Sequence, residues 1–411
     1  MERTLPVSLL AVVASALIGT HAHAAWLGEL RGSLESRYDD NTRLAIDDED
    51  ESSVATTGTL EGRLRRVTES SEISAILGGS YLAYSSYDGV RELDDEDIQY
   101  ADLRARNQGQ RLGVGLNGSV RRDVLLRTVG FIRDPIQDFE DAEGAPIIDD
   151  DVISDGGDVD AAFVDEQVRR IRTSATPYLD YQVSQLTRAR LGYNYLGLDY
   201  DDDLATGLQD SESHGVSADL RRQMSAQNAA RVTVGASRFE TDVTDSETDS
   251  YDLTVGWERE FTPRVTGSID VGGRRTERDD ESDTGFLLRL RGIRVTETGS
   301  LLGQLEHSLR PNGFGELVET DILLARYSVA LSDKWGFELG GRAHRTRQTL
   351  ETNEDNDRDY VEVGPQLTWS LTEVIALGAF YRYRYIDRKD EGDASSNAVG
   401  IQLAYQPRRR F

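Results

Sequence analysis

Charged side chains at every second position are the residues of this chain whose type and spacing could do chemistry. In FYRYRY (residues 380–385), two arginines alternate with three tyrosines. Successive side chains of an extended strand point to opposite faces of a sheet, so Arg382 and Arg384 share one face while the rings share the other. Guanidinium groups bind carboxylates and phosphates strongly. The stretch therefore predicts a strand with a polar face and an apolar face.

The same alternation recurs along the chain and defines a set of candidate site residues. The set consists of Arg63, Arg65, Arg104, Arg106, Arg289, Arg291, Arg342, Glu338, Glu362, Arg382 and Arg384. Two interpretations are open. The arginines form a ladder that guides anionic or hydroxyl-rich solutes, or they pair with carboxylates and cross-link neighbouring strands. The mixture of signs on one face favours the structural interpretation.

Histidine and acidic clusters give no sign of catalysis or of a dedicated metal site. His214, His307 and His344 have no nucleophile motif beside them, although catalytic triads are recognised by geometry and not by sequence position. We expect His214 and His344 to be plain polar surface. Acidic runs such as residues 46–50 and 199–203 lack the spacing of a calcium-binding loop. No catalytic residue, cofactor or metal ligand is predicted.

The elements that position the arginines are strands. Period-two alternation over about ten residues, as in 251–257 and 265–273, recurs throughout. The connections alternate in kind. Short turns, such as 262–264 and 331–334, follow one strand, and long acidic loops follow the next. The long loops include residues 39–53, 201–213, 240–250 and 277–284.

This alternation is typical of an all-β transmembrane antiparallel up-and-down β-barrel. We predict about eighteen strands, with sixteen as the lower alternative, short periplasmic turns and long acidic extracellular loops. The loop at residues 124–166 is the longest departure from the pattern. It is either an inward-folded constriction or a surface loop.

Composition and the N-terminus agree with an exported barrel. The 411 residues carry a net charge of −28 and no cysteine, and 38% are hydrophobic, so the fold must need little core. Residues 1–24 have the charged start, apolar run and small residues of a secretory signal peptide. Residues 25–411 are then the barrel domain, located in the cell outer membrane.

Three short motifs carry a resemblance to a known family. They are Tyr38-Asp39-Asp40-Asn41 after the first strand, RPNGFGELVETD at residues 310–321, and Ser396-Asn397-Ala398-Val399 at the start of the last strand. On these motifs the chain resembles outer-membrane β-barrel proteins of Gram-negative bacteria often encoded near exopolysaccharide loci. The resemblance implies a role in secretion or surface display of polysaccharide. Many barrels end in an aromatic residue that the assembly machinery reads, a role open here to Phe411 or Tyr405.

Two functions are therefore expected, neither of them enzymatic. The first is a porin-like channel or export conduit for a polar solute or exopolysaccharide. The second is a closed structural barrel whose acidic loops bind divalent cations, lipopolysaccharide or a partner. Outer-membrane lipid, lipopolysaccharide and the barrel assembly machinery are the expected partners. Nucleic acid is not, because acidic loops repel its phosphates.

Overall fold

The computed structural model describes ten ranges of the chain and one further residue. They are 26–45, 52–88, 93–125, 168–201, 208–241, 247–278, 281–312, 317–348, 357–389, 392–405 and 407. The expected signal peptide, residues 126–166 of the predicted long loop, and Phe411 lie outside them.

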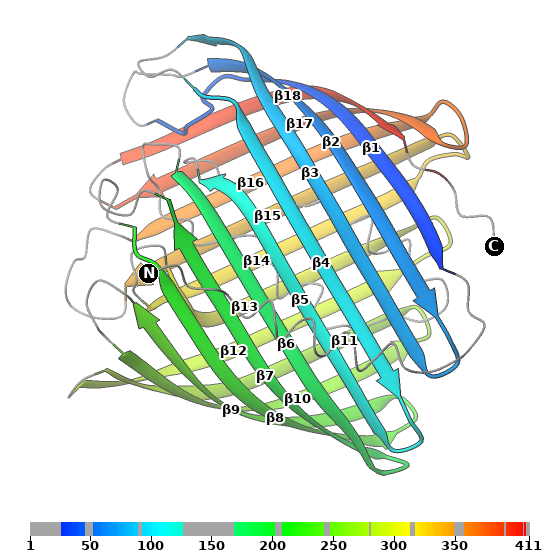
Figure 1. Ribbon diagram of the computed structural model, residues 1–411, viewed down its shortest axis with the longest axis vertical. Coiled ribbons are helices and arrows are strands. Elements are labelled where there is room, and N and C mark those ends of the chain that lie inside the picture. Colours follow the sequence, from blue (N-terminus) through cyan, green and yellow to red (C-terminus); the bar gives the residue numbers. More distant parts are fainter. Residues whose placement is uncertain are drawn as a thin grey trace.

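The described residues form one closed antiparallel barrel of eighteen strands, the number that the sequence predicts (Figure 1). Each strand pairs with its neighbours in the chain, and β1 also pairs with β18. Within the described ranges, no helix is long and apolar enough to cross a membrane. The strands are β1 (Leu27–Asp39), β2 (Ser52–Val67), β3 (Ser71–Asp88), β4 (Glu96–Gln108), β5 (Leu112–Leu125), β6 (Val168–Ser184), β7 (Thr187–Tyr200), β8 (Ser211–Ser225), β9 (Asn228–Thr241), β10 (Glu247–Thr262), β11 (Val265–Arg278), β12 (Glu281–Val295), β13 (Gly299–Pro311), β14 (Leu317–Ala330), β15 (Trp335–Gln348), β16 (Arg358–Ser370), β17 (Ile375–Arg388) and β18 (Gly392–Tyr405).

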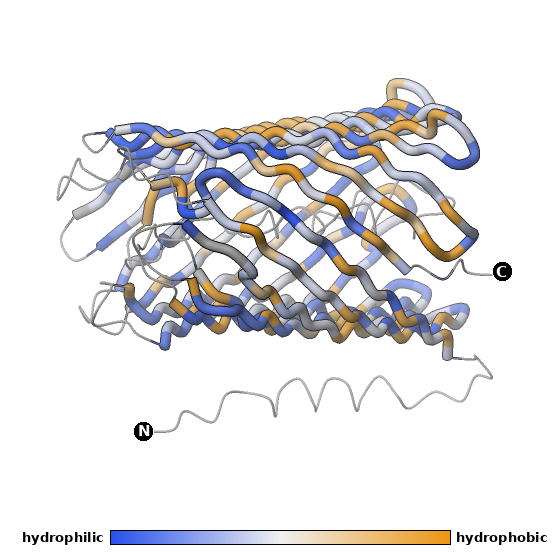
Figure 2. The backbone as a smooth tube through the Cα atoms, turned by 90° about the horizontal axis from the view of Figure 1, so that it is seen from above, coloured by the Kyte–Doolittle hydropathy of each residue, from blue (hydrophilic) through white to orange (hydrophobic). Residues whose placement is uncertain are grey.

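Hydrophilic and hydrophobic residues alternate along many of these strands (Figure 2). Because successive side chains of a strand point to opposite faces, this alternation separates an outward face from an inward face. On β10, Leu253 and Val255 are exposed on the outward side, while Asp252 and Thr254 face inward beside Gly235 and Thr233 of β9. The same division holds on β17, where Tyr381 is an exposed outward ring. Apolar side chains on the outside of the sheet suit a hydrocarbon environment. Closure of the sheet meets the second requirement of that environment, because it leaves no strand edge with unpaired backbone groups.

All four tryptophans of the chain lie near the end of the barrel that carries the short turns. Trp26 directly precedes β1, and Trp257 lies near the end of β10. Trp335 and Trp369 are cross-strand partners whose rings stack with centroids 5.6 Å apart. Tyrosines such as Tyr38 and Tyr251 are exposed towards the opposite end. Aromatic rings at both rims of an apolar belt are the girdles of a membrane barrel.

Strand lengths differ from the sequence prediction. The strands span 13 to 18 residues and not about ten. As a consequence, residues 277–284 are wrongly predicted as a loop, because β11 ends at Arg278 and β12 begins at Glu281. Cross-strand pairing continues through polar residues such as Glu277 and Ser282, beyond the apolar segment that periodicity detects.

Inward aromatic rings lie over glycines of the adjacent strand. A Cβ atom on Gly78 of β3 would sit 2.2 Å from the Tyr100 ring, so only glycine fits beneath it. The Tyr100 hydroxyl donates across β3 to Glu61 on β2 at 2.8 Å. Gly115 makes the same room for Tyr178. These rings rest on the wall instead of projecting into the lumen.

The division of faces predicts unequal effects for one substitution at two adjacent positions. Leu253→Arg places a charge in the outward apolar belt and should lower the free energy of unfolding by about 2–4 kcal/mol. Thr254→Arg, its inward neighbour, should change that free energy little. Urea titration of the barrel refolded into lipid vesicles measures both. Equal losses would mean that the outward face does not contact hydrocarbon.

Candidate functional site

The inward face of the barrel is polar and contains every candidate residue predicted from the sequence. Arg63, Arg65, Arg104, Arg106, Arg289, Arg291, Glu338, Arg342, Glu362, Arg382 and Arg384 all lie on the face opposite the exposed apolar side chains. The structure groups several of them into ion pairs. Glu72 binds both Arg65 and Arg106, at 2.8 and 3.3 Å. Glu362 binds both Arg342 and Arg382, at 3.3 and 3.5 Å.

Other candidates pair with residues that the sequence set lacks. Arg289 lies 3.3 Å from Glu306, and Glu338 lies 3.5 Å from Arg326. Arg104, in contrast, makes no ion pair with any described residue. The inward wall therefore contains cross-strand pairs together with arginines available to a solute.

Solvent exposure of the inward side chains differs between the two ends of the barrel. Near the short turns the side chain of Arg106 is 60% exposed, and those of Arg188 and Arg221 are also exposed. Near the opposite end, on β16 to β18 and β1, Arg384 and Asp39 retain only 5% and 3% exposure. The inward wall is therefore open to solvent near the short turns. Near the opposite end, its side chains on β16 to β18 and β1 are buried.

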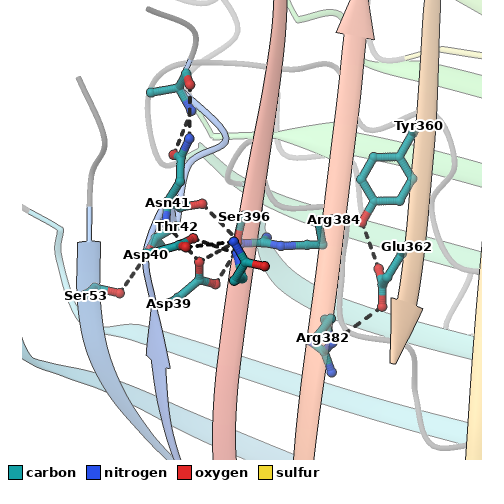
Figure 3. A network of polar contacts seen from close by, with 12 residues as sticks. Asp39, Asp40, Asn41, Thr42, Ser53, Tyr360, Glu362, Arg382, Arg384 and Ser396 are labelled. Atoms are coloured by element: carbon teal, nitrogen blue, oxygen red, sulfur yellow. Dashed lines mark hydrogen bonds and ion pairs between the residues drawn. The ribbon is translucent and has the colours of Figure 1, made fainter. Parts of the chain in front are cut away.

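A polar network, here called the closure clasp, joins β1 to β17 and β18 at this covered end (Figure 3). It consists of Asp39, Asp40, Arg384, Ser396 and Asn397. The Arg384 guanidinium donates to Asp39 Oδ2 at 2.7 Å, and the Ser396 hydroxyl donates to Asp39 Oδ1 at 2.6 Å. Asp40 accepts from the backbone N–H and the side-chain amide of Asn397, at 2.6 and 2.9 Å. Consecutive aspartates thus hold two consecutive residues of β18.

The clasp reinforces the pairing of β1 with β18, which is short compared with most strand pairings of the barrel. β1 pairs with β18 only from Gly32 to Asp39, whereas it pairs with β2 over its whole length. The reason is that β18 ends at Tyr405, before it reaches the first residues of β1. Buried side-chain bonds at one end of this seam therefore supplement a shortened ladder.

Residues 40–45, here called the inward turn, follow β1 and fold into the barrel. The Leu44 side chain is fully buried against Tyr360, Ile386 and Ala394, which lie on the inward faces of β16, β17 and β18. The Asn41 side chain closes the turn, since its Oδ1 accepts from the Ala45 N–H at 2.9 Å and its Nδ2 donates to the Ala45 carbonyl at 3.0 Å.

Leu44 has an unusual backbone conformation for a leucine. Its φ of 52° lies in the left-handed region, which costs a residue with a Cβ atom roughly 1–2 kcal/mol. Full burial of a leucine side chain is worth about 1.5–3 kcal/mol. The two effects are similar in size. The net free energy that Leu44 contributes to the inward position of the turn is therefore small, and the hydrogen bonds of the turn add to it.

The three histidines of the described residues, His214, His307 and His344, are placed differently from one another. The prediction that His344 is plain polar surface is wrong, because His344 is only 3% exposed. Its ring stacks on that of Tyr360 on the inward face, with the ring centroids 4.8 Å apart. Neither ring nitrogen of His344 has a hydrogen-bond partner in the described part of the chain. His214 and His307 lie outward, beside Tyr193 and Asp321 respectively. Among the described residues, no three or more histidine or acidic side chains are grouped to hold a metal ion.

The sequence did not reveal the clasp or the inward turn as structural units. Both Tyr38-Asp39-Asp40-Asn41 and Ser396-Asn397-Ala398-Val399 were visible only as motifs, at opposite ends of the chain. The structure brings them together, with Asp39 and Asp40 bonded to Ser396 and Asn397. Their unusual polarity at strand ends was the available signal.

Comparisons with known proteins give likeness of structure only. No protein-family model matches the chain, and no curated protein sequence resembles it. Among solved structures, OccAB4 of Acinetobacter baumannii is 12% identical with a TM-score of 0.46, over 92% of this chain and 98% of that one. OccK5 (OpdH) of Pseudomonas aeruginosa is 8% identical with a TM-score of 0.45, over 93% and 98%. The outer membrane channel DcaP of A. baumannii is 10% identical with a TM-score of 0.41, over 94% and 99%.

The buried position of the clasp predicts a large effect for one arginine. Arg384→Met removes the cation that is bonded directly to the buried Asp39 carboxylate and should cost about 3–5 kcal/mol of unfolding free energy. The double variant Arg384→Met, Asp39→Asn should recover a large part of this loss, because the carboxylate that Arg384 neutralised is then removed as well.

The exposed pair of Arg238 and Asp249 provides the control. Its atoms are 2.9 Å apart, but both side chains are about a third exposed or more, so Arg238→Met should cost at most about 1 kcal/mol. Urea titration in lipid vesicles compares the three variants. Similar losses for Arg384→Met and Arg238→Met would show that the clasp does not stabilise the barrel.

Proposed function

We propose that the protein is an outer-membrane channel through which polar, preferentially anionic solutes diffuse. The observation that carries the proposal is the solvent-exposed, arginine-rich inward wall of a closed eighteen-strand barrel whose outward face is apolar. A barrel of this strand number is too wide for its own side chains to fill the interior. A polar wall around such an interior favours a water-filled path.

The choice of arginine supports a preference for anions. Only Lys334 and Lys389 supply lysine, and both lie outside the strands, so every basic side chain on the inward strand face is arginine or histidine. Arginine presents a planar fork of donors to carboxylate and phosphate. Several inward arginines, including Arg104 and Arg106, are exposed to solvent at the short-turn end.

Membrane location and orientation are part of the proposal. The aromatic girdles and the outward apolar belt support insertion in the outer membrane, with the short turns in the periplasm and the inward turn at the extracellular mouth. Lipopolysaccharide and the barrel assembly machinery remain the partners that we propose for such a barrel. The resemblance to proteins encoded near exopolysaccharide loci brings acidic saccharides into the proposed solute class.

A closed structural barrel is the second candidate, and one observation favours it. Inward residues of β16, β17, β18 and β1 are buried beside the inward turn, so part of the extracellular mouth is covered. Conductance distinguishes the two candidates, because a permanently closed lumen carries no current.

Single-channel recording in planar bilayers tests the channel and its selectivity together. In a potassium chloride gradient, the reversal potential of the wild type should indicate preferential passage of chloride. Arg104→Gln with Arg106→Gln should shift that potential towards cations, because two exposed inward charges are removed.

The matched control is Arg238→Gln, which removes one outward charge and should leave the reversal potential unchanged. Absence of current from a barrel whose heat-modifiable gel mobility proves folding would contradict the channel. A cation-selective wild type would contradict the preference for anions alone.

A further inference from the structure

The inward turn has the features of a movable cover. Leu44 is the only large apolar residue with which the turn contacts the barrel wall. The backbone of Leu44 has a positive φ. Asp40, the first residue of the turn, stays bonded to Asn397 of β18. Beyond Leu44, residues 41–45 are held by the hydrogen bonds of Asn41, by the Thr42 hydroxyl 2.6 Å from that of Ser53, and by Arg384, which donates to the Asn41 carbonyl at 3.2 Å. None of these contacts lies in a strand ladder, so residues 41–45 can leave without breaking the sheet.

Polar groups beside the seat of Leu44 lack partners while the turn is in place. Tyr360, which contacts Leu44, stacks on His344, and the Arg342 guanidinium lies 5.5 Å from the Tyr360 ring centroid. Both nitrogens of His344 and Nε of Arg342 are buried without a hydrogen-bond partner among the described residues. Buried polar groups in native proteins are nearly always hydrogen-bonded, so this patch suits a ligand or solvent that the closed arrangement excludes.

We propose that residues 41–45 gate a solute-binding patch formed by Arg342, His344 and Tyr360. Glu362 accepts from Arg342 and from the Tyr360 hydroxyl and lies 3.5 Å from Arg382, so two arginines face this one carboxylate. The patch therefore combines a net positive charge, an aromatic ring and an imidazole with both nitrogens available, which together match an anionic, hydroxyl-rich solute such as a sugar acid. Solute binds only after Leu44 leaves Tyr360, and therefore stabilises the open arrangement. The proposal rests on the proposed channel function and adds the site that regulates it.

Thiol labelling can report the position of the turn, because the chain contains no cysteine. Leu44→Cys supplies one thiol, which a membrane-impermeant methanethiosulfonate reaches only when the turn is out. Leu82→Cys is the matched control, since Leu82 is 2% exposed on a strand, also on the inward side. We expect position 44 to label about tenfold faster or more than position 82 in folded protein in vesicles.

Glucuronate serves as the probe solute, with glucose as its uncharged counterpart. Glucuronate should accelerate labelling at position 44 by several-fold and glucose should do so less, because only glucuronate offers a carboxylate to Arg342. His344→Phe keeps a stacking ring and removes both nitrogens. In the Leu44→Cys background it should abolish most of the acceleration and slow the basal labelling, because the closed state no longer buries unpaired imidazole nitrogens.

Bilayer recordings separate failure of the gate from failure of the channel. Labelling of position 44 should raise the current of an already conducting protein, since the modified turn cannot return to its seat. Equal labelling at positions 44 and 82, or glucuronate acceleration that persists in His344→Phe, would overturn the gated patch and leave a conducting barrel intact. Absence of current before and after labelling would overturn the channel, and with it the gate.

Discussion

The pairing of β1 with β18 is the constraint on which the rest of the structure depends. It leaves each described strand with a hydrogen-bonded neighbour on both sides, which is what permits a sheet to face hydrocarbon. The seam is short, and the closure clasp adds buried side-chain bonds at one of its ends. Once the sheet is closed, period-two alternation directs side chains such as Leu253 outward and side chains such as Arg106 inward.

Among the described residues, the stabilising contacts lie in the wall and not in a central core. The inward face joins neighbouring strands by arginine–carboxylate pairs, such as Arg342 with Glu362, and by rings such as Tyr100 that rest on glycine. Two small apolar clusters supplement them, one around Leu44 and one around Leu198 and Tyr200. The same arginines can therefore hold strands together and contact solutes, and the exposure of each side chain decides which role is open to it.

Period-two patterning made the barrel, its strand number and the face of each strand predictable from the sequence. Arg382 and Tyr383 could be assigned to opposite faces because the energetic cost of arginine in lipid fixes the phase. Strand ends were less predictable, since pairing at Glu277 and Ser282 continues through polar residues. The contact of Leu44 with Tyr360, Ile386 and Ala394 was not predictable at all. It depends on one turn of irregular backbone and on residues more than three hundred positions away, for which periodicity carries no signal. The roles of the candidate arginines in transport stay a prediction.

The position of the clasp also has a consequence for how the chain acquires its shape. Asp39 and Ser396 are 357 residues apart in sequence. Every other pair of neighbouring strands is consecutive in the chain. Closing so large a loop carries the greatest entropic cost of any pairing in the barrel. Hairpins can therefore form locally and early, while the β1 and β18 edges stay unpaired and open to intermolecular association. The two motifs at the ends of the chain thus mark the step at which a curved, aggregation-prone sheet becomes a closed molecule.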